Sequence, residues 1–318
     1  MKILGKEIKP GESKVIEVKV AKLHTRDTLH IPIIIERAKI SGPTLLLIGG
    51  IHGDEVNGVS IIREIIKTGS NNPIRGTVIC IPVFNIFGYL HQTREFPDGR
   101  DLNRVFPGSA KGSLASQFAH HFVTEIAPHV DYILDFHSGS QERDNIPHVR
   151  CVLNEEKSFD LAKAFGAQFI VHSNYISKSI RETLYKMGKT TLLFEGGKAK
   201  NIDPEVVRAG VQGTKNIMAY LGMRNNNKSI ESNTVVIKKS SWVRAKHSGM
   251  FNLKTGNGEF VQKKEVLGYI TDPFGDFEKK VKAPHSGYII CTNKTAIVNR
   301  GDALFHISSE SYLLEDAE

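Results

Sequence analysis

The stretch Gly49-Gly-Ile-His-Gly-Asp-Glu55 decides how this chain folds. The residues just before it, Thr44 to Ile48, have the continuous apolarity of a strand buried on both faces. The glycines let the backbone turn sharply, and a helical pattern of apolar residues begins after Asn57. His52 and Glu55 are therefore predicted to lie on a strand-to-helix turn, where open α/β sheets bind their ligands.

His52 and Glu55 are also spaced so that an imidazole and a carboxylate can converge on one metal ion, and both are good zinc ligands. A second interpretation is a glycine-rich turn that carries an exposed histidine and a helix-capping acid. For an isolated pair of this kind the second interpretation is the more common one, so the rest of the chain has to decide.

Strands alternate with helices along residues 1–222. Predicted strands cover residues 13–20, 29–35, 44–48, 77–83, 130–136, 148–153, 168–172 and 190–194. Predicted helices follow Asn57 and cover 114–127, 158–166 (capped by Ser158), 179–187 and 204–221 (opened by Asp203-Pro204). Pro32 favours an edge position for its strand, and residues 85–113 are predicted to form a long functional loop. We predict an α/β domain with a mostly parallel mixed sheet flanked by helices.

A polar linker at 223–233 precedes a region of short strands and glycine turns at 234–318. This region contains a repeat, because Ala245-Lys-His-Ser-Gly249 returns as Ala283-Pro-His-Ser-Gly287. Its pattern resembles the β barrel-sandwich of biotinyl and lipoyl domains, so we predict a C-terminal all-β barrel-sandwich domain. The hairpin at 271–277 lacks the lysine that those carriers modify, and His247 and His285 are interpreted as structural turn residues.

The composition is that of an ordinary globular protein, with 318 residues, 40% hydrophobic and 24% charged. The N-terminal residues are charged where a signal peptide is apolar, and no run approaches the roughly 18–20 apolar residues of a membrane span. The three cysteines are scattered, which suits the reducing cytoplasm. The net charge of +8 comes without a basic stripe interleaved with aromatics, so we expect a small, anionic substrate and neither nucleic acid nor membrane as partner.

Two further motifs complete a constellation around the first turn. His137, in His-Ser-Gly, and Glu195, in Glu-Gly-Gly, each follow a predicted strand. Because the carboxyl ends of parallel strands meet at one sheet edge, all of these groups are expected at one site. His52, Glu55 and His137 would supply the three ligands of a catalytic zinc, which acidifies water and polarises a carbonyl. Glu195 would remain to carry the water proton to the leaving nitrogen.

Together these motifs resemble the succinylglutamate desuccinylase/aspartoacylase family, a branch of the zinc carboxypeptidase fold. The resemblance spans roughly residues 25–222, and the C-terminal region is also similar to that of the family. It rests on His52-x-x-Glu55, Asn85, Arg94, Asp101-Leu-Asn-Arg-Val-Phe-Pro-Gly108, Asp135-Phe-His-Ser-Gly139 and Phe194-Glu-Gly-Gly197.

The resemblance implies one zinc ion per chain, held by His52, Glu55 and His137, with Glu195 as general base and acid. It also implies that Arg94 stabilises the oxyanion and that Asn103 and Arg104 hold a substrate carboxylate, with Arg181 as a further substrate contact. Arg104 could instead form a salt bridge with Asp98 or Asp101, and Glu195 could be a buried acid paired with a lysine. Asp135 is interpreted as a group that orients a zinc histidine.

The leading hypothesis is a zinc hydrolase that cleaves the amide bond of a small N-acyl amino acid. A zinc carboxypeptidase acting on peptides and a non-catalytic zinc-dependent binding protein are the alternatives. The sequence indicates neither the acyl group nor the amino acid. It leaves three roles open for the C-terminal domain: capping the cleft, closing over it to select substrates, or building a homo-oligomer interface.

Overall fold

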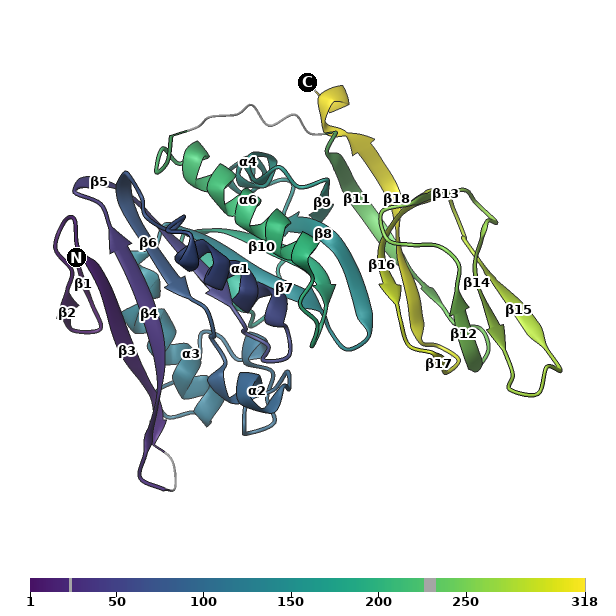
Figure 1. The fold of residues 1–318 in the computed structure, drawn as a ribbon, viewed down its shortest axis with the longest axis horizontal. Coiled ribbons are helices and arrows are strands. Elements are labelled where there is room, and N and C mark those ends of the chain that lie inside the picture. The colour runs from purple at the N-terminus through teal and green to yellow at the C-terminus, as the bar shows by residue number, and fades with distance from the viewer. Residues whose placement is uncertain (23–24, 226–232, 318) are drawn as a thin grey trace.

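A mixed β-sheet runs through the whole molecule (Figure 1). The computed structural model describes residues 1–22, 25–225 and 233–317. Within these residues the sheet has twelve strands, in the order β13 (Phe260–Val261), β16 (Gly287–Asn293), β18 (Ala303–Leu313), β11 (Val235–Arg244), β9 (Phe169–His172), β8 (Arg143–Cys151), β10 (Thr190–Lys198), β7 (Tyr132–Gly139), β5 (Ile40–Gly49), β6 (Arg75–Ile81), β4 (Thr28–Arg37) and β3 (Ser13–Lys22). A short hairpin of β1 (Lys2–Ile3) and β2 (Lys6–Glu7) stands apart.

The centre of the sheet is parallel, with β6, β5, β7 and β10 side by side. β8 runs antiparallel to β10, because only residues 140–142 separate it from β7 and no crossover helix intervenes. β3 and β4 extend the other side as antiparallel strands. The predicted mixed α/β sheet is confirmed, and the parallel centre brings the carboxyl ends of β5, β7 and β10 to one edge.

Apolar side chains cover both faces of the central strands. In β5, Leu45 and Leu47 pack into one core with α1 (Val56–Lys67), α4 (Glu156–Phe165) and α6 (Pro204–Tyr220). Leu46 and Ile48 point to the opposite core, which holds α3 (Leu114–Glu125) and α5 (Ile180–Lys186). This alternation is why β5 reads as a continuous apolar run.

Three local predictions need correction. β4 lies between β3 and β6 and is not an edge strand, although its ladder with β6 begins only at Ile34, so Pro32 is paired on one side alone. α4 begins at Glu156 with Glu155 as its N-cap, and Ser158 is a buried residue inside the helix. The long loop contains α2 (Ile86–His91), which Asn85 caps by accepting from the Gly88 amide, and the 3-10 turn Leu102–Arg104.

The C-terminal region is entirely β up to a final 3-10 turn, Leu314–Ala317, and adds a four-stranded sheet in the order β15 (Glu278–Lys282), β14 (Val266–Thr271), β12 (Gly249–Leu253) and β17 (Ile297–Val298). Side chains from this sheet and from β11, β13, β16 and β18 share one apolar core, with Phe251, Leu267 and Phe305 among its members. The barrel-sandwich arrangement and the division into residues 1–222 and 234–318 stay predictions. Residues 226–232 of the predicted linker lie outside the described residues.

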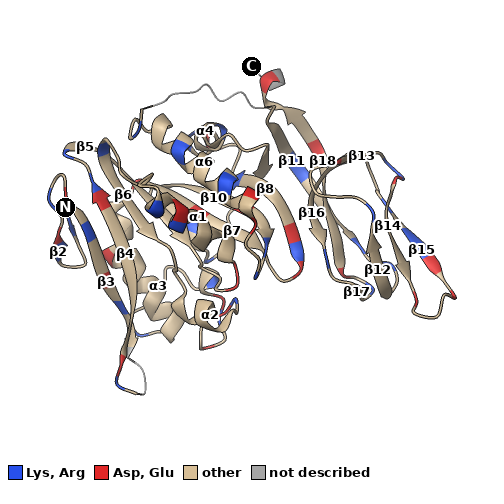
Figure 2. Ribbon diagram, viewed as in Figure 1, with Lys and Arg blue, Asp and Glu red and all other residues tan. Residues whose placement is uncertain are grey.

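Acidic and basic residues are interspersed along the ribbon in both parts of the molecule (Figure 2). Of the helices in the described ranges, none has the length and apolarity needed to span a bilayer.

Candidate active site

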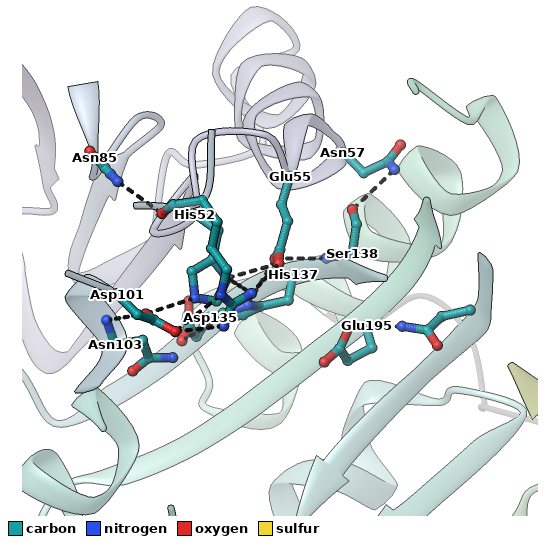
Figure 3. Close-up of polar contacts among 12 residues, drawn as sticks. His52, Glu55, Asn57, Asn85, Asp101, Asn103, Asp135, His137, Ser138 and Glu195 are labelled. Carbon is teal, nitrogen blue, oxygen red and sulfur yellow. Dashed lines mark hydrogen bonds and ion pairs between the residues drawn. The ribbon is translucent and has the colours of Figure 1, made fainter. Parts of the chain in front are cut away.

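His52, Glu55 and His137 form a buried cluster at the carboxyl end of the central strands (Figure 3). Nδ1 of His52 lies 2.8 Å from Oε1 of Glu55, and Nδ1 of His137 lies 2.9 Å from Oε2 of the same carboxylate. His52 and Glu55 come from the turn between β5 and α1, and His137 comes from the end of β7. The side chains are 6% exposed or less, so the cluster is shielded from bulk water.

The backbone of the first turn requires glycine where the chain comes closest to its neighbours. A Cβ on Gly53 would lie 1.8 Å from the carbonyl carbon of Gly88 in α2. Gly50 has φ +61°, in the left-handed region that favours glycine. These glycines let the turn pack directly on α2, which fixes the position of His52.

Asn57 connects the start of α1 to β7, to β10 and to the start of α6. Its side-chain amide nitrogen donates to Oγ of Ser138 at 3.1 Å and to the carbonyl of Lys198 at 3.4 Å. Its side-chain oxygen accepts from the backbone amide of Asp203, at the start of α6, at 2.8 Å. Asn57 is fully buried, so its position is determined by these partners.

A second layer of carboxylates surrounds the two imidazoles. Nε2 of His137 contacts Oδ2 of Asp135 at 2.9 Å, as expected for a group that orients a ligand histidine. Nε2 of His52 lies 3.3 Å from Oδ1 of Asp101, but without hydrogen-bond alignment. Burial opposes a positive charge here, yet Asp135 and Glu55 outweigh it and raise the pKa of His137 well above its usual value.

This donor set fits a zinc ion. Two imidazole nitrogens and a carboxylate converge within 4.8 Å of one another, and two-histidine, one-carboxylate sets are a standard arrangement for catalytic zinc. The Asp135 contact leaves Nδ1 of His137 directed at Glu55 and able to bind a cation. His52, Glu55 and His137 could therefore hold a metal.

Arg94 lies beside this cluster. Its Nη1 is 3.3 Å from Oε1 of Glu55 and 3.2 Å from Nδ1 of His52. Its Nε and Nη2 both donate to Oδ2 of Asp101, at 3.0 and 2.8 Å, which holds the guanidinium in place. The arrangement puts a fixed positive charge next to the candidate metal position.

Asn103 and Arg104 line one side of the cleft. The side-chain oxygen of Asn103 accepts from the Ile180 amide at 2.9 Å, which ties this turn to the start of α5. Arg104 is exposed and donates to the Asn103 carbonyl at 2.7 Å. The predicted alternative partners are engaged elsewhere, since Asp98 pairs with Arg100 and Asp101 with Arg94.

Arg181 also lines the cleft, directly after Ile180, and is only 7% exposed. It donates to the Ser173 carbonyl at 2.7 Å and stacks over Tyr175 at 5.1 Å. Burial lowers its pKa. Among the residues that the structure describes, no carboxylate pairs with Arg181, so the cleft contains a buried positive charge.

Glu195 reaches the cleft from β10, where its register partner in β7 is His137. Asn145 donates to Oε2 of Glu195 at 3.0 Å, and Nε of Arg150 lies 3.8 Å from Oε1. The side chain is 15% exposed, and burial raises the pKa of its carboxyl. A carboxylate with a raised pKa is suited to accept a proton. The predicted alternative, a lysine partner, is not seen in the described part of the chain.

The cleft has a volume of about 270 Å³, close to the lower end of the range for small-molecule sites. Two of its lining residues, Trp242 and Cys291, belong to the C-terminal region, which thus forms part of the cleft wall.

Sequence reasoning missed Asn57, Asn145, Arg143 and Trp242. Of these only Asn57 had a local signal, since it adjoins the first motif.

The chain matches the model of a known family. Residues 41–221 match the succinylglutamate desuccinylase/aspartoacylase catalytic domain, which is more than half of the chain. The chain is also 28% identical to N-alpha-acetyl-L-2,4-diaminobutyric acid deacetylase from Halomonas elongata over 277 residues, which covers 83% of this chain and 81% of the relative.

Solved structures share the fold over nearly the whole chain. A succinylglutamate desuccinylase/aspartoacylase from Rhodobacter sphaeroides has a TM-score of 0.82 and 25% identity, with 95% of each chain covered. The product-bound ectoine utilization protein EutE from Ruegeria pomeroyi has a TM-score of 0.83 and 22% identity, with 96% of this chain and 97% of that chain covered. The similarity therefore includes the C-terminal region.

Proposed function

Because the chain belongs to the succinylglutamate desuccinylase/aspartoacylase family, we propose that it is a zinc-dependent deacylase that hydrolyses the amide bond of a small N-acyl amino acid. The observation that carries this proposal is the convergence of His52, Glu55 and His137 beside Glu195, at one end of the parallel strands. The three unpaired, buried cysteines agree with a cytoplasmic enzyme.

The reaction adds water across the amide bond. The C–N bond breaks, the water oxygen joins the acyl carbon, and the products are a carboxylate and an amino acid with a free amine. A zinc ion held by His52, Glu55 and His137 would polarise the substrate carbonyl and acidify the attacking water.

Glu195 moves the protons in this proposal. Its carboxylate takes a proton from the attacking water and returns it to the leaving nitrogen. Asn145 fixes one carboxylate oxygen by its hydrogen bond, so that Oε1 remains to accept the proton. Burial raises the pKa of Glu195, which makes its carboxylate a stronger proton acceptor for the attacking water.

The arginines bind negative charge. Arg94, beside the metal ligands, stabilises the negative charge that develops on the carbonyl oxygen. Asn103 and Arg104 hold the carboxylate of the amino acid, for which the planar guanidinium is well suited. Arg181 supplies a further positive charge in the lining of the cleft.

The test is hydrolysis by chelator-treated protein before and after zinc is restored, with N-acyl amino acids and short peptides offered in parallel. We expect no turnover without metal, recovery with about one zinc per chain, and a clear preference for the acyl amino acids. Faster cleavage of the peptides would instead identify a carboxypeptidase. Bound zinc without hydrolysis of any compound would identify a binding protein.

A further inference from the structure

Arg143 and Trp242 form a wall of the cleft that the proposed reaction does not use. The Arg143 guanidinium carbon lies 5.4 Å from the centre of the Trp242 ring. The imidazole of His306 stacks on the same indole, with ring centres 4.7 Å apart and planes 10° from parallel. The Trp242 ring is therefore packed against both the His306 imidazole and the Arg143 guanidinium.

The charge of Arg143 is not neutralised within the described residues. The neighbouring acids already have partners, since Glu142 pairs with Lys198 at 2.8 Å and Asp144 faces Lys294 at 3.7 Å. Arg150, the other arginine on this wall, faces Glu195 and donates to His148. Arg143 therefore presents a pre-oriented cation to the cleft, and within the described ranges its guanidinium packs on an aromatic face rather than on a carboxylate.

Arg143 lies on the side of the cleft away from Arg104. Figure 3 shows Asn103 and Glu195 on opposite sides of the metal-ligand cluster. Arg143 is two residues from Asn145 on β8, and Asn145 bonds Glu195, so Arg143 belongs to the Glu195 side. If the proposed function holds, the amino acid carboxylate sits at Asn103 and Arg104. The acyl group then extends toward Arg143.

We propose that Arg143, held on Trp242, binds a carboxylate at the far end of the acyl group, so that the preferred substrates are amides of a dicarboxylic acid. A guanidinium can form two parallel hydrogen bonds with such a carboxylate. An acetyl group ends in a methyl and leaves Arg143 without an anion. This inference rests on the proposed function for the orientation of the substrate, and it gives the C-terminal region a role in substrate selection.

Binding of product acids tests the subsite without turnover. Trp242 is the single tryptophan of the chain, so its fluorescence reports directly on ligands near Arg143. We expect zinc-loaded protein to bind succinate at least 10-fold more tightly than acetate, with a change in Trp242 fluorescence. Arg143→Met should remove that preference, while Arg208→Met, at an exposed arginine of α6, should retain it. Equal binding of the two acids, or a preference that survives in Arg143→Met, overturns the inference.

Turnover gives the second readout, with N-succinyl and N-acetyl forms of one amino acid. Arg143→Met should reduce kcat/KM about 10- to 100-fold for the succinyl compound and less than about 3-fold for the acetyl compound, as expected for loss of a charged hydrogen-bonded pair. Equal losses on both compounds, or a lowered Tm, would mean that Arg143 only stabilises the packing of the C-terminal region through Trp242. Either result would overturn the inference. Arg143-dependent succinate binding without hydrolysis of either compound would leave the subsite standing and refute the proposed function.

Discussion

Asn57 illustrates how one buried amide positions side chains that are far apart in the sequence. It joins the start of α1 to Ser138 on β7, to Lys198 on β10 and to Asp203 at the start of α6. The turn before α1 carries Glu55, and strands β7 and β10 carry His137 and Glu195. Its contribution to the site is therefore geometric, through the distances between those three groups.

Replacing Asn57 by Ala should weaken both the fold and the site. Buried hydrogen-bond partners are left unsatisfied, at about 1–3 kcal/mol of unfolding free energy each when no water replaces the amide. We expect a loss of about 2–4 kcal/mol in denaturant unfolding, together with weaker zinc binding. The matched control is Asn216→Ala, which removes a hydrogen bond to the Phe165 carbonyl away from the cleft. It should lower stability but leave zinc affinity unchanged; equal effects of the two variants on zinc affinity would contradict this role for Asn57.

At the scale of elements, strands β11 and β18 place Trp242 opposite His306 in their antiparallel ladder. Burial first, and then the charge of Arg150, lowers the pKa of His306 to about 3. Its buried Nδ1 has no hydrogen-bond partner in the described part of the chain. The imidazole stacked on the indole is therefore neutral at physiological pH.

His306 should make the fold sensitive to acid. Its pKa is about 3 in the folded chain and near 6.5 when unfolded, so between these values the unfolded chain binds the extra proton. Stability is then full above about pH 6.5 and falls as the pH decreases, by up to about 1.4 kcal/mol per unit. His306→Phe keeps the aromatic stack and removes the titration.

The measurement is denaturant unfolding of wild type and His306→Phe at pH 7.5 and pH 5. We expect the wild type to lose about 2 kcal/mol more than the variant between these pH values, since His306 alone differs. Equal losses in the two proteins would show that His306 does not carry this sensitivity.

Most helices and strands could be predicted, because the residues that specify each of them lie close together in the sequence. The α6 cap at Asp203-Pro204 and the continuous apolar run of β5 act within a few residues, and both are found as expected. α2 was missed because it has only six residues, and its stability depends on the Asn85 cap and on packing against Gly53. β4 is an internal strand because it pairs with β6, some 40 residues later in the chain. Pro32 gives no sign of that pairing.

At the scale of the whole molecule, one sheet joins the two predicted domains. β11 pairs with β9, and β16 pairs with the start of β8. Phe169, Val171, Val235, Ile237 and Ile290 form an apolar core across this junction. The strands of the C-terminal region therefore continue the sheet of residues 1–222.

This continuity predicts cooperative unfolding. Far-UV circular dichroism and the fluorescence of Trp242 should give coincident denaturant transitions. Ile237→Ala, in the shared core, should move both curves together by about 2–5 kcal/mol. A Trp242 transition at clearly lower denaturant would show that the C-terminal region unfolds by itself.

Some residues of the candidate site lie in local sequence motifs and could be predicted, whereas others could not. The convergence of the three candidate ligands was predictable, because each lies in a short motif at or just after the end of a strand of the parallel centre. Arg143 and Trp242 were not, because 99 positions separate them (242 − 143) and neither lies in a motif. Their contact depends on the pairing of β11 with β9 and of β16 with β8, which no local sequence pattern predicts.

We propose that His52, Glu55 and His137 hold the metal while Glu195 transfers the proton. The sharpest test is to measure zinc content and turnover of Glu195→Gln beside the wild type. We expect about one zinc per chain in both proteins and a loss of turnover of about 100-fold or more in the variant. Full activity in Glu195→Gln, or loss of its zinc, would refute these roles.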